Sequence, residues 1–218
     1  LKLLLLKDIE LVATEDSYIG IAAASEGLYK DKGSRFIAYA YPVSSEQEVK
    51  PLVDALKAEH HAARHHCYAY RIGVGGAIYR SSDDGEPSGT AGRPILGAID
   101  SAGLSDVLVV VVRYFGGILL GVPGLIQAYR EAAADALARA VTVGKLAVRS
   151  IALEFSYEEM NLVQKVLKST RDLEQVSQNF DIQCRMQVNV RLSEADNLIE
   201  RINRINDERG THIQCRSL

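Results

Sequence analysis

Two segments of this sequence concentrate side chains that can do chemistry, and the first of them is acidic. Residues 81–94 read S-S-D-D-G-E-P-S-G-T-A-G-R-P and hold carboxylates, a hydroxyl and a guanidinium in close succession: Asp83, Asp84, Glu86, Thr90 and Arg93. Neighbouring carboxylates could hold Mg²⁺ or serve as general acid and base. The segment is also dense in turn-forming residues, so an irregular surface loop without chemistry is the simpler interpretation.

The second segment begins at Arg113, which directly follows the apolar run 107–112. It continues through Tyr114 into a glycine-rich turn that contains Gly116, Gly117, Gly121 and Gly124. Because backbone N–H groups at a helix start carry partial positive charge, Arg113 and this turn could bind an anion. The glycines could instead serve only tight turning and close packing, since the turn matches neither a Walker loop nor the dinucleotide-binding motif. Arg113 needs a partner or solvent in either case, because burying an unpaired charge is costly.

The histidines are concentrated around Cys67, at His60, His61, His65 and His66. Adjacent residues of a strand point to opposite faces, so His65 and His66 cannot share one ion without a bend. The spacing also matches no zinc motif, and we therefore expect neither a metal site nor a cofactor. We expect one of His65 and His66, together with Arg64, to line a groove beside the acidic segment.

A buried strand and a helix must position Arg113 and the glycine-rich turn. The unbroken apolar run 107–112 predicts a central strand that is buried on both faces. A helical pattern follows from residue 125, with Pro123 in the first turn and with Tyr129, Ala133 and Leu137 on the inner face. The other expected elements of this half are an appended arm over residues 1–16, a hairpin of residues 18–29 and 35–43 around Gly33, a helix opened by a Ser45/Glu48 capping box, a strand over 63–72 and a helix over 94–102.

The pattern changes near residue 145 and predicts a second domain with the order βαββαβ, so the domains are expected at residues 1–143 and 146–218. Ser156 and Glu159 predict a capping box for its first helix. Residues 182–192 alternate strictly between apolar and polar side chains, which predicts a strand with one open face. That face lacks aromatic residues for stacking bases, which leaves contact with phosphates or protein, or plain solvation. Its basic side chains are Arg185, Arg191 and Arg216.

Composition limits the class of protein. The chain has 218 residues, of which 47% are hydrophobic and 24% charged, as is typical of a soluble globular protein. The net charge of −3 argues against a protein that holds duplex DNA through many phosphates. Its three cysteines are odd in number and far apart, which indicates no disulfide framework and fits the cytoplasm. The apolar start at residues 1–8 is too short to span a membrane, and no membrane contact is expected.

Three motifs resemble those of the YigZ/IMPACT family: A-R-H-H-C at 63–67, S-D-D-G-E-P-S-G-T-A-G-R-P at 82–94 and V-V-R-Y-F-G-G-I-L-L-G at 111–121. The resemblance implies an α+β protein of two domains. The first would have the βαβ-type fold shared with a small-subunit ribosomal protein and the GHMP kinases. The second would be ferredoxin-like and similar to the fifth domain of elongation factor G. The family motifs fall on His65, His66, Asp83, Asp84, Gly85, Glu86, Pro87, Thr90, Gly92, Arg113, Tyr114, Gly116, Gly117 and Gly121.

The resemblance also suggests a function. Eukaryotic relatives restrain a starvation-sensing kinase of translation initiation, using an additional domain that is not expected in this sequence. We therefore hypothesise a non-enzymatic binding protein that contacts RNA or ribosome-associated proteins and helps to regulate translation. One alternative is an enzyme acting on a small phosphorylated substrate, with the acidic segment as a metal-binding loop. Another is a protein-only adaptor that holds a partner peptide in the groove.

Overall fold

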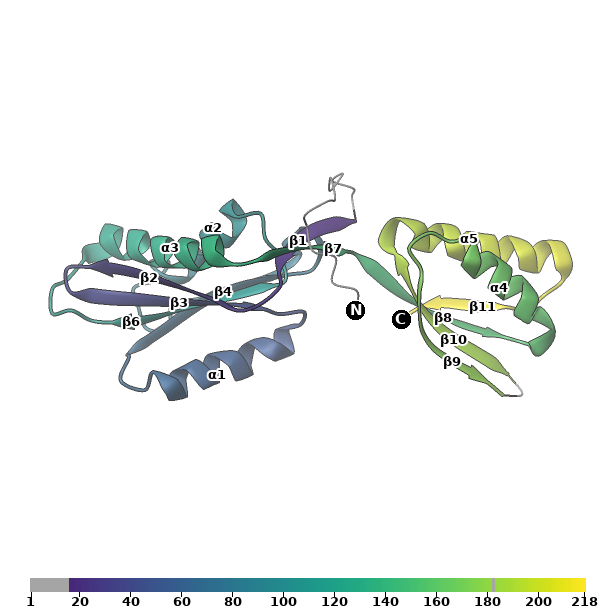
Figure 1. Ribbon diagram of the computed structural model, residues 1–218, viewed down its shortest axis with the longest axis horizontal. Helices are drawn as coiled ribbons and strands as arrows, with labels where there is room; N and C mark the ends of the chain where they lie inside the picture. Colours follow the sequence, from purple (N-terminus) through teal and green to yellow (C-terminus); the bar gives the residue numbers. More distant parts are fainter. Residues whose placement is uncertain (1–15, 182) are drawn as a thin grey trace. The chain divides into compact units, whose positions relative to one another are not determined.

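The computed structural model describes residues 16–181 and 183–218, which form two compact units. The first unit comprises Tyr18–Lys145, and the second comprises Leu146–Leu218 together with Asp16 and Ser17. Each unit has its own sheet and its own apolar core, so the protein is a two-domain α+β protein (Figure 1). The arm expected over residues 1–16 lies, apart from Asp16, outside the described residues.

A five-stranded antiparallel sheet forms the first unit, and β6 (Val107–Tyr114) is its central strand. The strand order is β2-β3-β6-β4-β5, with β2 (Ser25–Asp31), β3 (Ser34–Pro42), β4 (His65–Ile72) and β5 (Ile78–Ser82). Because β6 is antiparallel to both β3 and β4, those two strands run parallel to each other. With α1 (Val49–Glu59) between them in the chain, they form a split βαβ unit. β1 (Ser17–Ile21) and β7 (Thr142–Leu146) pair in a separate two-stranded sheet.

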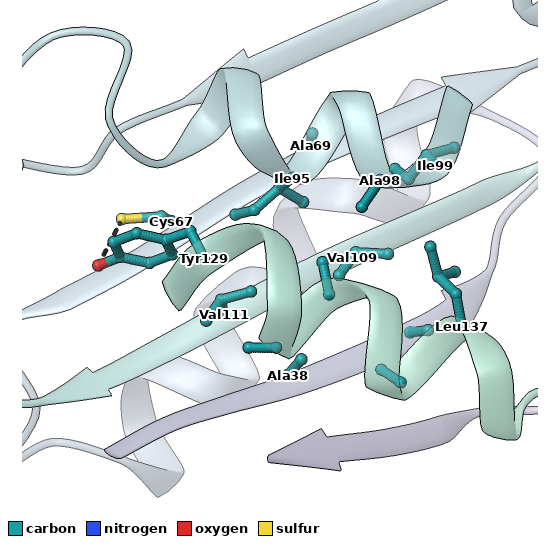
Figure 2. Packing of buried hydrophobic residues seen from close by; sticks show 14 of the residues in the cluster. Ala38, Cys67, Ala69, Ile95, Ala98, Ile99, Val109, Val111, Tyr129 and Leu137 are labelled. Carbon is teal, nitrogen blue, oxygen red and sulfur yellow. Dashed lines mark hydrogen bonds between the residues drawn. The ribbon is translucent and has the colours of Figure 1, made fainter. Parts of the chain in front are cut away.

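Helices cover both faces of the five-stranded sheet (Figure 1). α1 packs on one face, whereas α2 (Gly92–Ser101) and α3 (Gly121–Arg139) pack on the other. Because side chains alternate along β6, its residues contribute in turn to the two cores. All six residues from Val107 to Val112 are fully buried, which confirms the predicted central strand. Figure 2 shows the α2 and α3 side of this core, where Tyr129 lies near the end of β6.

The hairpin predicted around Gly33 is formed by β2 and β3. Its turn residues, Lys32 and Gly33, have φ angles of +45° and +79°. Positive φ at both turn positions suits the right-handed twist of a two-residue hairpin. The segment expected as one strand over residues 18–29 is divided, because β1 ends at Ile21 and β2 begins at Ser25.

The predicted start of α1 differs in detail. A capping box requires the Ser45 hydroxyl to accept from a backbone N–H, but this hydroxyl donates to Glu48 Oε1 at 2.8 Å. The Ser44 hydroxyl donates to the same oxygen at 2.7 Å. A short 3₁₀ turn, η1 (Glu46–Glu48), therefore precedes α1, and the helix begins at Val49.

Two elements near the acidic segment differ from the sequence prediction. The sequence predicts no strand over residues 78–82, but β5 forms there and pairs with β4, so it takes in Ser81 and Ser82 from the start of the acidic segment. α2 begins at Gly92 and not at residue 94. Its early start follows from Asp83, whose carboxylate accepts hydrogen bonds from the backbone N–H groups at the helix start.

The second unit has the predicted βαββαβ order and the strand order β11-β8-β10-β9. Ser156 and Glu159 form the predicted capping box at η3 (Tyr157–Glu159). The alternation predicted over residues 182–192 is confirmed for Cys184 to Val190, but Leu192 already belongs to a helix, and Ile182 is outside the described residues. The elements are β8 (Val148–Phe155), α4 (Met160–Lys168), β9 (Glu174–Phe180), β10 (Cys184–Arg191), α5 (Leu192–Arg209) and β11 (Gln214–Ser217). Within the described chain, no helix combines the length and apolar character needed to cross a membrane.

Candidate binding site at the end of the central strand

Arg113 and Glu86 form an ion pair at the end of β6. Arg113 Nη1 donates to Glu86 Oε1 at 2.5 Å, and the Tyr129 hydroxyl donates to the same oxygen at 2.7 Å. The side chains of Arg113 and Glu86 are only 8% and 4% exposed. The guanidinium carbon also lies 5.5 Å and 5.7 Å from the ring centroids of Phe36 and Phe115. The partner that Arg113 requires is therefore a carboxylate of the acidic segment.

A tight turn directs Glu86 toward Arg113. Asp84 and Gly85 have φ angles of +38° and +86°, and Glu86 N donates to Asp83 O at 2.9 Å. Glycine adopts such left-handed angles without steric cost, and aspartate tolerates them better than most residues. The order D-D-G-E is thus suited to a reversal that brings Glu86 to the end of β6.

The other two carboxylates hold the acidic segment in place. Asp83 accepts backbone hydrogen bonds from Gly89 at 2.8 Å, Ala91 at 3.1 Å and Gly92 at 2.8 Å. Burial by itself would raise the pKa of Asp83, but these N–H groups and nearby Arg93 lower it below its ordinary value. Both carboxylate oxygens of Asp83 therefore accept hydrogen bonds from backbone N–H groups of the segment and of the start of α2.

Asp84, Thr90 and Arg93 also belong to the loop or its border. Asp84 accepts from the backbone N–H of His66 at 2.7 Å and from Lys57 Nζ at 3.1 Å. The Thr90 hydroxyl donates to Pro87 O at 2.7 Å, and Arg93 is exposed in the first turn of α2. Among residues 16–181 and 183–218, no group of three histidine, cysteine or acidic side chains is arranged to hold a metal ion.

His65 and His66 lie in different environments on β4. His65 Nδ1 bonds the carbonyl oxygen of Asp84 at 2.9 Å, and its side chain lines a groove. His66 is buried, and its Nε2 atom has no hydrogen-bond partner among the described residues. Burial lowers the pKa of His66, although Asp84 acts in the opposite direction. Of the two histidines, His65 is the one beside Arg113.

The groove has a volume of about 630 Å³ and opens beside the ion pair. It forms where two distant segments meet, because β4 and β6 are paired with His65 opposite Arg113. The acidic segment adjoins it through Glu86, which bonds Arg113. The groove is lined by Ala62, Arg64, His65, Arg113, Tyr114, Phe115 and Leu119.

Large apolar side chains stand exposed in the turn between β6 and α3. Phe115 and Ile118 are each 57% exposed, Leu119 is 81% exposed and Val122 is 51% exposed. We call these four residues the apolar ridge. Leu120, between them, is only 9% exposed and lies at the start of α3. The turn therefore presents aliphatic and aromatic surface beside the groove.

Glycines shape this turn in different ways. A Cβ atom on Gly116 would lie only 2.0 Å from the carbonyl carbon of Gly33, so Gly116 allows the turn to pack on the β2–β3 hairpin. Gly117 and Gly121 have φ angles of +89° and +71°, which other residues adopt only with strain. Gly124 lies in the first turns of α3, with Leu120 next to it. These positions have conformational and packing reasons for glycine that require no ligand.

The basic residues proposed for the second unit separate into two environments. Arg185 and Arg216 are 64% and 70% exposed, and each lies near Glu154, with N–O distances of 3.5 Å and 3.6 Å. Arg191 is only 16% exposed, because it is paired with Asp16 at 2.9 Å and with Asp172 at 3.3 Å. Arg191 occupies the same alternating position along β10 as Arg185, but its ion pairs leave its side chain less accessible than those of Arg185 and Arg216.

The residues that sequence reasoning missed are Tyr129 and the aliphatic part of the ridge. Tyr129 falls on the inner face of a helical pattern, where an aromatic residue is expected simply to be core. It is indeed fully buried, but its hydroxyl donates to Glu86 and accepts from Cys67 Sγ. Figure 2 shows the contact with Cys67. The apolar triplet at residues 118–120, enclosed by glycines, was the available signal for the ridge.

Comparisons with known proteins agree with this architecture. A family model of the Impact N-terminal domain matches residues 32–137. An IMPACT family member of Thermus thermophilus is 46% identical over 136 residues, which cover 62% of this chain and 73% of that protein. IMPACT family member YigZ of Escherichia coli is 36% identical over 154 residues, covering 70% and 76%. A crystal structure described as that of a hypothetical protein is 29% identical, with a TM-score of 0.69 over 93% of this chain and 98% of that one. The chain therefore belongs to the IMPACT family.

Proposed function

We propose that this IMPACT family protein is a non-enzymatic binding protein that contacts RNA and the translation apparatus, and so takes part in regulating translation. One observation carries the proposal. The carboxylates that could do chemistry are engaged within the fold, whereas basic and aromatic side chains remain accessible. Family membership supports a link to translation, because the resemblance implies that eukaryotic relatives act on translation initiation. The free thiols of Cys67, Cys184 and Cys215 suit a reducing compartment such as the cytoplasm.

RNA contact is assigned to the open sheet face of the second unit. Arg185 on β10 and Arg216 on β11 lie on opposite sides of β8 and share Glu154 as their nearest carboxylate. Both are more than 60% exposed, so they can exchange this weak pairing for a phosphate. Without aromatic residues on this face, recognition would rest on backbone phosphates and shape and not on bases. Net charge −3 limits the site to a few phosphates.

Filter binding of RNA over a range of salt concentrations tests this assignment. Native protein should bind single-stranded or duplex RNA at low salt, with an affinity that falls as salt rises. The double variant Arg185→Glu/Arg216→Glu should weaken binding and reduce the salt slope by about 1–2. Arg204→Glu, at an exposed position of α5, is the matched control. Absence of binding at low salt, or equal binding by the double variant, would defeat the proposal.

The enzymatic alternative makes a different prediction. An enzyme for a phosphorylated substrate with an acidic metal loop needs carboxylates free to bind Mg²⁺, yet Asp83 and Glu86 bond backbone N–H groups, Arg113 and Tyr129. We expect no rise in melting temperature when nucleotides and Mg²⁺ are screened against the protein. A reproducible rise that Asp83→Asn abolishes would favour the enzyme.

A further inference from the structure

The apolar ridge is an unusual feature for a solvent-exposed surface. Phe115, Ile118, Leu119 and Val122 lie within a span of eight residues, and each is more than half exposed. Single exposed apolar residues are ordinary, but contiguous apolar surface marks an interaction site or an aggregation hazard. The ridge is also held in a defined shape, because Gly116 packs on the β2–β3 hairpin and Leu120 is buried at the start of α3. A preformed apolar surface loses little conformational entropy on binding.

The charge beside the ridge is positive. Arg64 lines the same groove as Phe115 and Leu119, and its side chain has no ion pair or hydrogen bond with the described residues. Arg35 is exposed as well and stacks on Tyr114, with its guanidinium carbon 5.1 Å from the ring centroid. Glu86, the carboxylate that bonds Arg113 beside the groove, is nearly fully buried and already neutralises that guanidinium. A ligand at this groove therefore meets the guanidinium of Arg64, which no ion pair among the described residues compensates, and Arg35 lies against Tyr114 of the groove lining.

We propose that the groove and the apolar ridge form a docking site for a short acidic and apolar peptide segment of a partner protein. Its large apolar side chain packs between Phe115 and Leu119, and its adjacent carboxylate pairs with Arg64. Buried anchors with a charged rim are the common anatomy of such interfaces. This inference deepens the proposed function by naming the chemistry of a protein partner, and it uses the first unit, whereas RNA contact is assigned to the second.

The aliphatic residues favour a peptide over the other occupants. A single-stranded nucleic acid would stack on Tyr114 and Phe115 but would gain no stacking from Ile118, Leu119 or Val122. A second copy of this chain, bound through the same surface, would bring Arg64 and Arg35 of both copies into one interface. Only a segment that carries both carboxylates and apolar side chains complements all parts of this surface.

Selection from a random peptide display library against the full chain tests the proposal. We expect the enriched peptides to place Asp or Glu beside Leu, Ile or Phe. The affinity of the enriched peptides is then measured by fluorescence anisotropy. Leu119→Ser should lower this affinity about 10-fold or more, as for loss of a central anchor. Arg64→Glu should weaken it about 5-fold and reduce its salt dependence, as for a charge at the interface rim. Tyr157→Ser, at a side chain 74% exposed in the second unit, is the control and should bind like native protein.

Three kinds of result would overturn the inference. Failure to enrich peptides, enrichment of basic or purely polar peptides, or equal binding by Leu119→Ser would contradict the site. RNA affinity that is lost in Leu119→Ser would make the groove a nucleic-acid site. A dimer, detected by light scattering, that becomes a monomer in Leu119→Ser would make the ridge a self-association surface. Because Arg185→Glu/Arg216→Glu should leave peptide binding intact, the peptide site and the RNA proposal can fail separately.

Discussion

Arg113 at the end of the central strand and Glu86 in the acidic segment are joined by a 2.5 Å ion pair, with both side chains more than nine-tenths buried. Tyr129 of α3 adds a hydrogen bond to the same carboxylate. The pair therefore connects three segments of the first unit: the acidic loop, β6 and α3. The ion pair also helps to position the groove lining, because Phe115 packs over the Arg113 guanidinium and both residues line the groove.

Breaking this pair from one side should be costly. Glu86→Gln leaves the Arg113 guanidinium buried without a compensating charge, and Arg113 Nε already lacks a hydrogen-bond partner among the described residues. Removal of one member of a buried pair typically lowers the free energy of unfolding by about 3–5 kcal/mol. Urea denaturation followed by circular dichroism measures the change.

The double variant Glu86→Gln/Arg113→Met provides the matched comparison. It removes the uncompensated charge, so its destabilisation should be smaller than the sum of those of the two single variants. Asp54→Ala, which removes one partner of the exposed Lys50–Asp54 pair, should leave the transition unchanged. A loss below about 1 kcal/mol in Glu86→Gln would show that the pair does not anchor the loop.

Stability should depend on pH through Asp83. The pKa of Asp83 is lower in the folded protein than its unfolded value of about 4, so its stabilising contribution is complete above pH 4. That contribution is lost as the pH falls through the folded pKa, because protonation weakens the bonds to Gly89, Ala91 and Gly92. Asp83→Asn should melt earlier at pH 7 and show a shallower decline below pH 4. Melting temperatures from pH 2.5 to 7 test this, with the exposed Glu131→Gln as control, which should follow the native curve.

Gly116→Ala should deform the turn. Its Cβ would meet the backbone of Gly33 and Ser34 at 2.0–2.4 Å, and backbone cannot move aside as the end of a flexible side chain can. We expect a loss of about 1–3 kcal/mol or more, as for overpacking in a filled core. Gly97→Ala in α2 has open space around its Cβ and should gain about 0.5–1 kcal/mol of helix stability. Equal melting temperatures for the two variants would contradict the close approach of the turn to the hairpin.

The cysteines should be unreactive in the folded protein. Burial raises the pKa of Cys67 well above its ordinary value, and it raises that of Cys215 to about 11. Thiolate is the reactive form, so Ellman's reagent at pH 7.5 should modify Cys215 slowly and leave the fully buried Cys67 and Cys184 intact. All three should react at once in guanidinium chloride. Rapid modification of Cys67 in buffer would instead reveal that the acidic loop opens, since Cys67 Sγ donates to Asp83 O at 3.0 Å.

Local patterns predicted much of the architecture. The apolar run 107–112 favoured a strand buried on both faces, and the alternation of Cys184, Met186, Val188 and Val190 favoured a strand with one buried face, as the structure confirms. The hairpin at Gly33 and the capping box at Ser156 were also predicted from local sequence, and both are present. These features depend on neighbours in the chain, because burial period, turn angles and caps are set within a few residues.

Only the tertiary structure decided which charges and surfaces meet. The sequence required a partner for Arg113, but three carboxylates were candidates, and the pairing with Glu86 depends on a left-handed turn and on the place of α3. It likewise could not separate Arg191 from Arg185, since the ion pair with Asp16 joins residues far apart in the chain. The ridge is the clearest case: apolar residues ordinarily predict burial, and only the packing of Gly116 and Leu120 leaves Ile118 and Leu119 in solvent.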